Sequence, residues 1–154
     1  MLPVPRYRQR DPISCLPTCV HAVLEYRHGE NAITYEDVFE ACCLDSKGAV
    51  VDLAIQGLQE AGWDLGILTY QDLASIKELV DIGDPVVVIR AVIQQGSNSL
   101  GHAVVVCALD DSSITVMDPA VGDYITLALA DNDLLETEII QGFTIAGFPA
   151  SNAR

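Results

Sequence analysis

Residues 102–119 read HAVVVCALDDSSITVMDP, which is two apolar runs joined by the polar segment 110–113. Runs rich in β-branched residues on both sides of a short polar turn are typical of a β-hairpin. The run 85–93, PVVVIRAVI, follows a proline and predicts a further strand. Segments 124–129 and 143–148 have shorter strand patterns. The second half of the chain is therefore expected to form an antiparallel sheet.

The first half of the chain has the patterns of helices. Helices are predicted over residues 15–29, 34–45, 49–63 and 71–83, with a short strand at 65–70. Ser14 is a candidate cap for the first helix, and Thr34 with Asp37 resembles a capping box for the second. Helices followed by an antiparallel sheet predict an α+β fold. The length of 154 residues suits a single domain, 1–154.

The net charge of −14 is unevenly distributed. Half of the eight basic residues lie within the first 27 positions, and residues 28–154 hold 20 acidic against 4 basic residues. Such a surface repels phosphate backbones, which excludes nucleic acid as a partner. A cationic peptide is the better candidate. The alternative is that the charge only keeps the protein soluble.

The cysteine count indicates a reducing compartment. Five cysteines cannot all pair within one chain, and the cytosol keeps thiols reduced. Their spacing lacks the paired ligands of a structural zinc site, so neither a metal nor another cofactor is expected. No apolar run approaches the roughly 20 residues that span a bilayer. The first twelve residues have arginines but no apolar stretch after them, unlike a secretory signal. A cytoplasmic location is therefore predicted.

Cys15 lies in the segment 9–19, QRDPISCLPTC, at the predicted start of the first helix. The positive end of a helix dipole favours a thiolate, and such settings lower the pKa of reactive cysteines. Cys19 is one turn further along, where the dipole is weaker. Cys15 is thus the candidate nucleophile. The alternative is a small buried helix residue, since free cysteines are commonly buried and inert.

His102 and Asp118 are the candidate partners of this thiol. His102 follows a glycine and opens an apolar strand, and Asp118 ends the next strand. If the two strands form a hairpin, both residues come out near the same open end. A carboxylate there can orient the imidazole and fix its tautomer. Taken singly, His102 also fits a surface loop and Asp118 a turn.

Gln9 completes the constellation. A side-chain amide is a neutral donor suited to an oxyanion that forms only transiently. The backbone N–H of Cys15 at the helix start is a candidate second donor. Together with Cys15, His102 and Asp118, the chain has the order Gln, Cys, His, Asp.

These residues resemble the papain-like cysteine peptidases of the bacteriocin-processing family, which cut leader peptides after a double glycine. The likeness lies in the glutamine six residues before the cysteine, in GHAVVVCALDD (101–111) and in DPAVG (118–122). Segment 75–92 also resembles the family's lead-in to its central strand. The resemblance covers about residues 9–148. It implies a papain-like fold with a helical lobe, a sheet lobe and a cleft between them.

The resemblance also implies roles for the four residues. Cys15 would be the nucleophile, His102 the general base and then acid, Asp118 the orienting residue and Gln9 the oxyanion donor. Family members are often fused to a membrane-spanning exporter. Here an exporter or another domain would come from a separate chain. At the nucleophile the family usually has DCG, whereas this chain has Ser14 and Leu16 around Cys15. We expect Leu16 to add bulk beside the nucleophile and to affect double-glycine specificity.

Three functions remain open on the sequence. The first is a cysteine endopeptidase that cleaves a peptide or a leader bond. The second is another thiol-dependent acyl transfer, as in an amidase, deamidase, isopeptidase or transglutaminase, because a triad does not choose between water and an amine as acceptor. The third is an inactive module that binds a leader peptide. Such a module would be expected to lose the cysteine or the histidine, and this chain keeps both.

Overall fold

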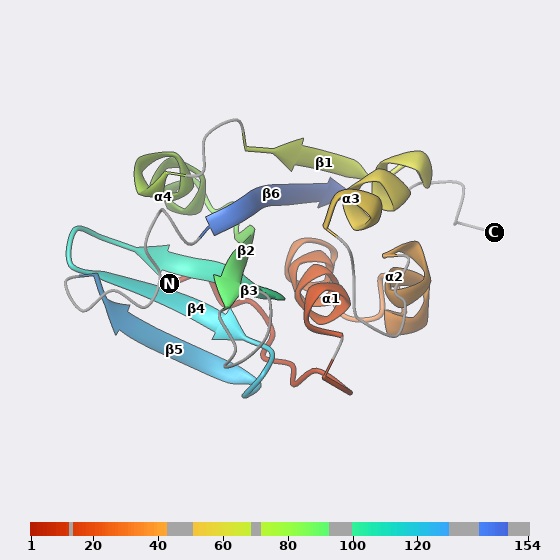
Figure 1. The fold of residues 1–154 in the computed structure, drawn as a ribbon, viewed down its shortest axis with the longest axis horizontal. Coiled ribbons are helices and arrows are strands. Elements are labelled where there is room, and N and C mark those ends of the chain that lie inside the picture. Colours follow the sequence, from red (N-terminus) through yellow and green to blue (C-terminus); the bar gives the residue numbers. More distant parts are fainter. Residues whose placement is uncertain (13, 43–50, 69–71, 93–99, 130–138, 148–154) are drawn as a thin grey trace.

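The computed structural model describes residues 1–12, 14–42, 51–68, 72–92, 100–129 and 139–147 (Figure 1). Its helices are α1 Cys15–His28, α2 Tyr35–Ala41, α3 Val51–Glu60 and α4 Leu73–Asp81. Its strands are β1 Asp64–Ile67, β2 Val86–Val92, β3 Leu100–Leu109, β4 Ser113–Asp118, β5 Asp123–Ala128 and β6 Ile139–Gly147. The predicted α+β class is confirmed. Parts of the predicted elements, at 43–45, 49–50, 69–71, 93 and 148, lie outside the described residues.

The strands form one sheet in the order β1-β6-β2-β3-β4-β5, and every pair is antiparallel. The predicted hairpin of β3 and β4 is confirmed. Asp110 closes its turn, because its N–H donates to the Ser113 carbonyl at 3.0 Å and its Oδ1 accepts from the N–H groups of Ser112 and Ser113. The short strand from the first half, β1, pairs with β6 at one edge of the sheet.

Both faces of the central strands are covered. Val87 and Ile89 of β2 pack with α1 in one apolar cluster, whereas Val86 and Val88 pack with α4 in another. Figure 1 shows α1 between the sheet and α2, with α4 apart from these two helices. Burial on both faces explains why the β2 sequence is continuously apolar instead of alternating.

The helix ends follow local sequence, with one correction. Thr34 accepts a hydrogen bond from the Asp37 N–H at 3.2 Å, as the capping-box pattern predicts. α1 ends at His28, and its C-cap is Gly29, whose φ of 93° suits glycine. Ser14 does occupy the N-cap position of α1, but its side chain does not cap the helix. Its Oγ instead bonds to the backbone of Asp11 at 3.3 Å, which fixes the loop before Cys15.

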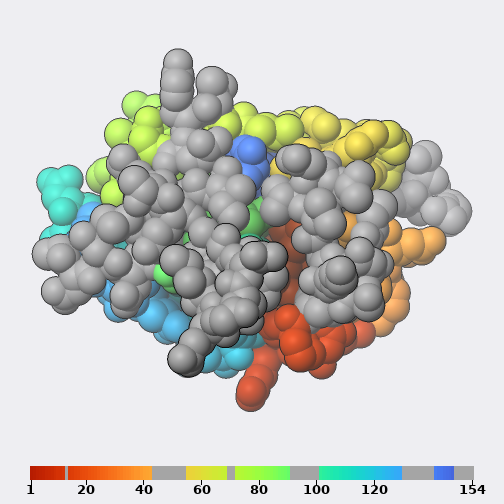
Figure 2. Space-filling model, in the orientation of Figure 1, coloured from red at the N-terminus to blue at the C-terminus, as the bar shows by residue number. Residues whose placement is uncertain are grey.

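The N-terminal arm, residues 1–12, is anchored along the sheet. The Leu2 N–H donates to the Cys107 carbonyl at 2.9 Å, and the Tyr124 hydroxyl donates to the Val4 carbonyl at 2.5 Å. In Figure 2 the red N-terminal atoms reach the surface between the blue sheet strands and the orange α2 region. The arm therefore joins the strand half of the fold to its helical half. The described part of the chain contains no helix with the length and hydropathy of a membrane span.

Candidate active site

Cys15 is the first residue of α1 and is partly exposed. Burial alone would raise the pKa of its thiol. A hydrogen bond and the positive charge of His102, with backbone hydrogen bonds at Ala103 and Leu16, outweigh burial and leave the pKa below its ordinary value. The start of α1 determines the position of the thiol. The hydrogen bond with His102 of β3 lowers the pKa of that thiol more than any other contact. The contact with His102 therefore favours the thiolate form of Cys15.

The hairpin brings His102 and Asp118 together, as the sequence predicts. His102 Nε2 lies 2.8 Å from Asp118 Oδ1. The hydrogen bond to Asp118, and then that to Cys15, raise the pKa of His102 to about 9 against the opposing effect of burial. Because Nε2 faces the carboxylate, Nδ1 is the ring nitrogen left to exchange a proton with Cys15.

Asp118 is held in its ionised form by several groups. Burial alone would raise its pKa, but the hydrogen bond from His102, the Ala120 N–H at 2.9 Å and the charges of His102 and Arg90 lower it below the ordinary value. Arg90 of β2 stands opposite His102 in the β2–β3 register. No sequence motif pointed to Arg90. The feature that could have identified Arg90 is that it is the single charged residue in the apolar run 85–93.

The side chain of Gln9, the predicted oxyanion donor, bonds to its own segment. Its side-chain Nε2 donates to the Asp11 carbonyl at 2.8 Å, and its Oε1 is buried without a partner among the described residues. Within the described residues, no hydrogen bond joins the Gln9 amide to the side chains of Cys15, His102 or Asp118. An amide NH₂ has two N–H groups, so one remains beyond the bond to Asp11.

The turn 118–122 links Gln9 to Asp118. The Gln9 backbone N–H donates to the Pro119 carbonyl at 2.8 Å, directly after Asp118. Gly122 has a φ of 70°, and a Cβ at this position would lie 2.9 Å from the Arg8 Cβ. Only glycine combines this backbone angle with so close an approach. The sequence DPAVG thus forms a turn that seats the segment carrying Gln9.

A second anchor fixes the same segment to α1. The Tyr7 hydroxyl donates to Glu25 Oε2 at 2.5 Å, and His21 Nε2 lies 3.2 Å from Glu25 Oε1. The Tyr7 and His21 rings stack with centroids 5.4 Å apart. The hydrogen bond to Glu25 is the largest influence that raises the pKa of Tyr7 to about 12. Sequence patterns did not reveal this cluster because Tyr7 lies 18 residues before Glu25, outside α1.

The residues flanking Cys15 point away from solvent. Leu16 is 4% exposed and lies in the core with α1, so its bulk is inside the domain. Cys15 packs against the same cluster, and the effect of Leu16 on double-glycine specificity stays a prediction. Ser14 is fully buried on the Asp11 backbone.

The other described cysteines differ from Cys15. Cys19 is fully buried, and burial raises the pKa of its thiol well above the ordinary value. Burial likewise raises the pKa of Cys107 to about 12. The described residues contain no group of three or more side chains suited to hold a metal ion. Thiol chemistry at Cys15 is what this arrangement of side chains offers.

Two solved structures of other proteins resemble this chain in fold. The peptidase domain of Streptococcus ComA, a bifunctional ABC transporter involved in a quorum-sensing pathway, superposes with a TM-score of 0.67 at 14% identity, covering 94% of this chain and 98% of that domain. A Bacillus anthracis protein described as a C39-like peptidase has a TM-score of 0.64 at 15% identity, covering 94% of this chain and 95% of that one. No curated protein matches the chain.

The resemblance inferred from the sequence is thereby confirmed at the level of fold and family. The likeness to both solved structures covers nearly the whole chain and shows the same mixed helix-and-sheet fold. Residues 1–133 match the family described as Peptidase_C39-like, which supports a cysteine-peptidase type of activity. Since that match spans most of the 154 residues, the chain belongs to the peptidase C39-like family.

Proposed function

We propose that this protein is a cysteine endopeptidase that cleaves a peptide or leader bond with Cys15 as nucleophile. The observation that carries the proposal is the contact of His102 with Asp118 on one side and with Cys15 on the other. This contact lowers the pKa of the thiol and raises that of the imidazole, which favours the thiolate–imidazolium pair. Asp118 orients the ring through Nε2.

The first half-reaction acylates Cys15. The thiolate attacks the scissile carbonyl carbon, a C–S bond forms, and the carbonyl oxygen becomes an oxyanion. The remaining N–H of the Gln9 amide and the Cys15 backbone N–H stabilise that oxyanion. As the C–N bond breaks, His102 gives its Nδ1 proton to the leaving amine. A thioester remains on Cys15, and the amine product leaves.

The second half-reaction releases the acyl group. Neutral His102 takes a proton from water, and the resulting hydroxide attacks the thioester carbonyl. The C–S bond breaks, and Cys15 leaves as a thiolate that again faces imidazolium His102. A carboxylic acid product forms, so atoms and charge balance over the cycle. Water as acceptor makes the enzyme a peptidase rather than an acyl transferase.

The proposed chemistry has consequences for location and partners. It needs a reduced Cys15, which the cytoplasm maintains. The ComA domain belongs to an ABC transporter, which supports an association of this chain with an exporter. Its substrate is then a peptide or small protein on its way to export.

A peptide library tests the proposal. The wild type is incubated with the library in water enriched in heavy oxygen, and the products are read by mass spectrometry. Cleavage with heavy oxygen in the new carboxyl group is expected, and Cys15→Ala should abolish it. Cys19→Ala is the matched control, because it removes a buried thiol one turn along the same helix.

The alternatives give different products. Amine-linked products would support acyl transfer in place of hydrolysis. Cleavage that survives Cys15→Ala would eliminate the nucleophile. Peptide binding without any cleavage by the wild type would instead favour an inactive leader-binding module.

A further inference from the structure

A pocket lies beside the segment that carries Gln9 and precedes Cys15. Its volume is about 260 Å³, and its lining residues are Arg10, Asp11, Tyr35, Glu36 and Phe39. Asp11 ties it to the active site, because its carbonyl accepts from Gln9 Nε2 and its backbone bonds to Ser14, the neighbour of Cys15. Asp11 therefore connects the pocket to the segment that precedes Cys15.

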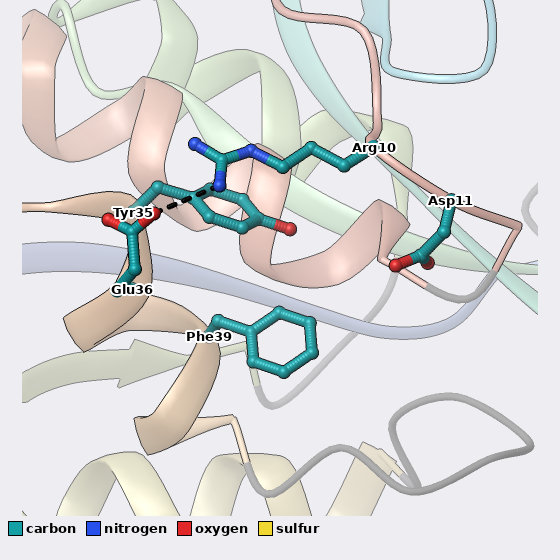
Figure 3. Close-up of a pocket in the computed structure, with 5 residues that line it drawn as sticks. All are labelled: Arg10, Asp11, Tyr35, Glu36 and Phe39. Atoms are coloured by element: carbon teal, nitrogen blue, oxygen red, sulfur yellow. Dashed lines mark hydrogen bonds and ion pairs between the residues drawn. The ribbon is translucent and has the colours of Figure 1, made fainter.

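The walls suit a long side chain with a positive end. Tyr35 and Phe39 pack with ring centroids 6.0 Å apart and give an aromatic wall. Two carboxylates, Asp11 and Glu36, oppose the single positive charge of Arg10. Figure 3 shows the Tyr35 hydroxyl pointing toward the side where Asp11 lies. That hydroxyl is buried and has no hydrogen-bond partner among the described residues, and Tyr35 is 8% exposed.

Arg10 shows that the pocket accepts a basic group. Its guanidinium carbon lies 3.8 Å from the centroid of the Tyr35 ring, and its Nη1 lies 3.0 Å from Glu36 Oε1 (Figure 3). A cation over an aromatic face and beside a carboxylate is a recognition arrangement for lysine or arginine. The Arg10 side chain is nevertheless 59% exposed. Exposed pairs of this kind are weak, so a competing cation can displace Arg10 at low cost.

We infer that this pocket is a substrate subsite for a lysine or arginine side chain, and that Arg10 occupies it until the substrate arrives. The inference rests on the proposed peptidase function and gives its substrate a chemical class. Charge supports it, since residues 28–154 hold 20 acidic against 4 basic residues. We expect the basic residue near the scissile bond, because Asp11 of the pocket bonds to Gln9 and to Ser14, the neighbour of Cys15.

Paired peptides test the subsite. The probe is a set of internally quenched peptides, randomised except for one scanned position that is lysine or norleucine. These side chains have similar length and differ in charge. The measured quantity is the ratio of kcat/KM for lysine over norleucine at each position. A folding defect in a variant lowers both rates alike and leaves this ratio unchanged.

The wild type is expected to prefer lysine at one position. Arg10→Ala removes the internal competitor and should raise the ratio at that position about three- to tenfold. Glu36→Gln removes a carboxylate partner and should lower it by a similar factor. Arg6→Ala is the matched control. Arg6 lies over the Tyr124 ring at 5.5 Å and pairs with Asp123 at 3.2 Å, outside this pocket, so the ratio should not change.

The outcomes separate the two proposals. Cleavage with no lysine preference at any position, or a preference that none of the pocket variants alters, overturns the subsite alone. An Arg6→Ala effect equal to that of Arg10→Ala overturns it as well, because general surface charge would then explain the ratio. Absence of any Cys15-dependent cleavage overturns the peptidase function.

Discussion

The backbone N–H of Gln9 donates to the carbonyl oxygen of Pro119 at 2.8 Å. This bond joins the segment that carries the proposed oxyanion donor to the turn that carries Asp118. Positions far apart in the sequence are thereby held by one short turn. The position of the Gln9 amide then depends on the residues of the turn 118–122.

Gly122→Ala tests this dependence. The new Cβ would meet Arg8 at 2.9 Å and shift the segment that leads to Gln9. We expect kcat for peptide cleavage to fall about tenfold or more, because a misplaced oxyanion donor costs transition-state stabilisation. Alkylation of Cys15 by iodoacetamide should change less than about twofold, because that displacement forms no carbonyl oxyanion.

Gly83→Ala is the matched control for Gly122→Ala. Its φ is 90°, but a Cβ there meets nothing within 4 Å. It therefore introduces the same kind of backbone strain, about 1–2 kcal/mol, without moving Arg8. Equal losses of cleavage and alkylation in Gly122→Ala, or equal losses of cleavage in both variants, would contradict a positioning role.

The pH dependence of cleavage follows from the thiolate–imidazolium pair. His102 keeps its proton until its raised pKa, so activity should fall as the pH rises through about 9, when no proton remains for the leaving amine. The pKa of Cys15 is lowered, so the acid limb should lie below the ordinary pKa of a thiol. A profile of kcat/KM against pH measures both limbs, which belong to the coupled pair. Activity that continues to rise above pH 10 would count against this pair.

Asp118→Asn should move the alkaline limb. The hydrogen bond to Asp118 is the largest cause of the raised pKa of His102, and an amide carries no negative charge. We expect the limb to shift to lower pH and kcat to fall about tenfold or more. Asp123→Asn is the control, because Asp123 stands opposite Asp118 in the β4–β5 register and pairs with Arg6. Identical profiles for wild type and Asp118→Asn would show that this carboxylate does not orient His102.

Thiol reactivity should separate Cys15 from the other described cysteines. At mildly acidic pH, brief exposure to iodoacetamide should label Cys15, because its pKa is lowered, and leave Cys19 and Cys107, whose pKa values burial raises. Peptide mapping of the adduct checks the site. His102→Ala should slow the labelling. An adduct that forms first on Cys19 would contradict the assignment.

Phe143→Ala tests the core that supports the site. Phe143 is fully buried in β6, opposite Val87 in β2 and Ile67 in β1. Its truncation should lower the free energy of unfolding by about 3–5 kcal/mol, measured in urea. Ile82→Ala is the control, since Ile82 is 78% exposed and should change stability by less than about 0.5 kcal/mol. Similar losses in both variants would contradict the packing described for β6.

The sequence predicted features that depend on neighbouring residues. The Thr34 cap with Asp37, the C-cap of α1 at Gly29 and the hairpin turn at Asp110 all involve groups within a few positions. The hairpin also determined the meeting of His102 and Asp118, because the two strands are consecutive. The predicted side-chain cap at Ser14 was wrong, since the backbone of Asp11 offered the hydroxyl a competing partner.

The sequence by itself determined the α+β class, the helix start that carries Cys15 and the hairpin that carries its candidate partners. Only the tertiary structure decided that β1 pairs with β6, that Arg90 stands opposite His102 and that Arg10 lies on Tyr35. It alone joined Gln9 to Pro119. The physical reason is range: helix dipoles, caps and turns act over a few residues, whereas these contacts depend on how distant elements pack and therefore leave no local pattern.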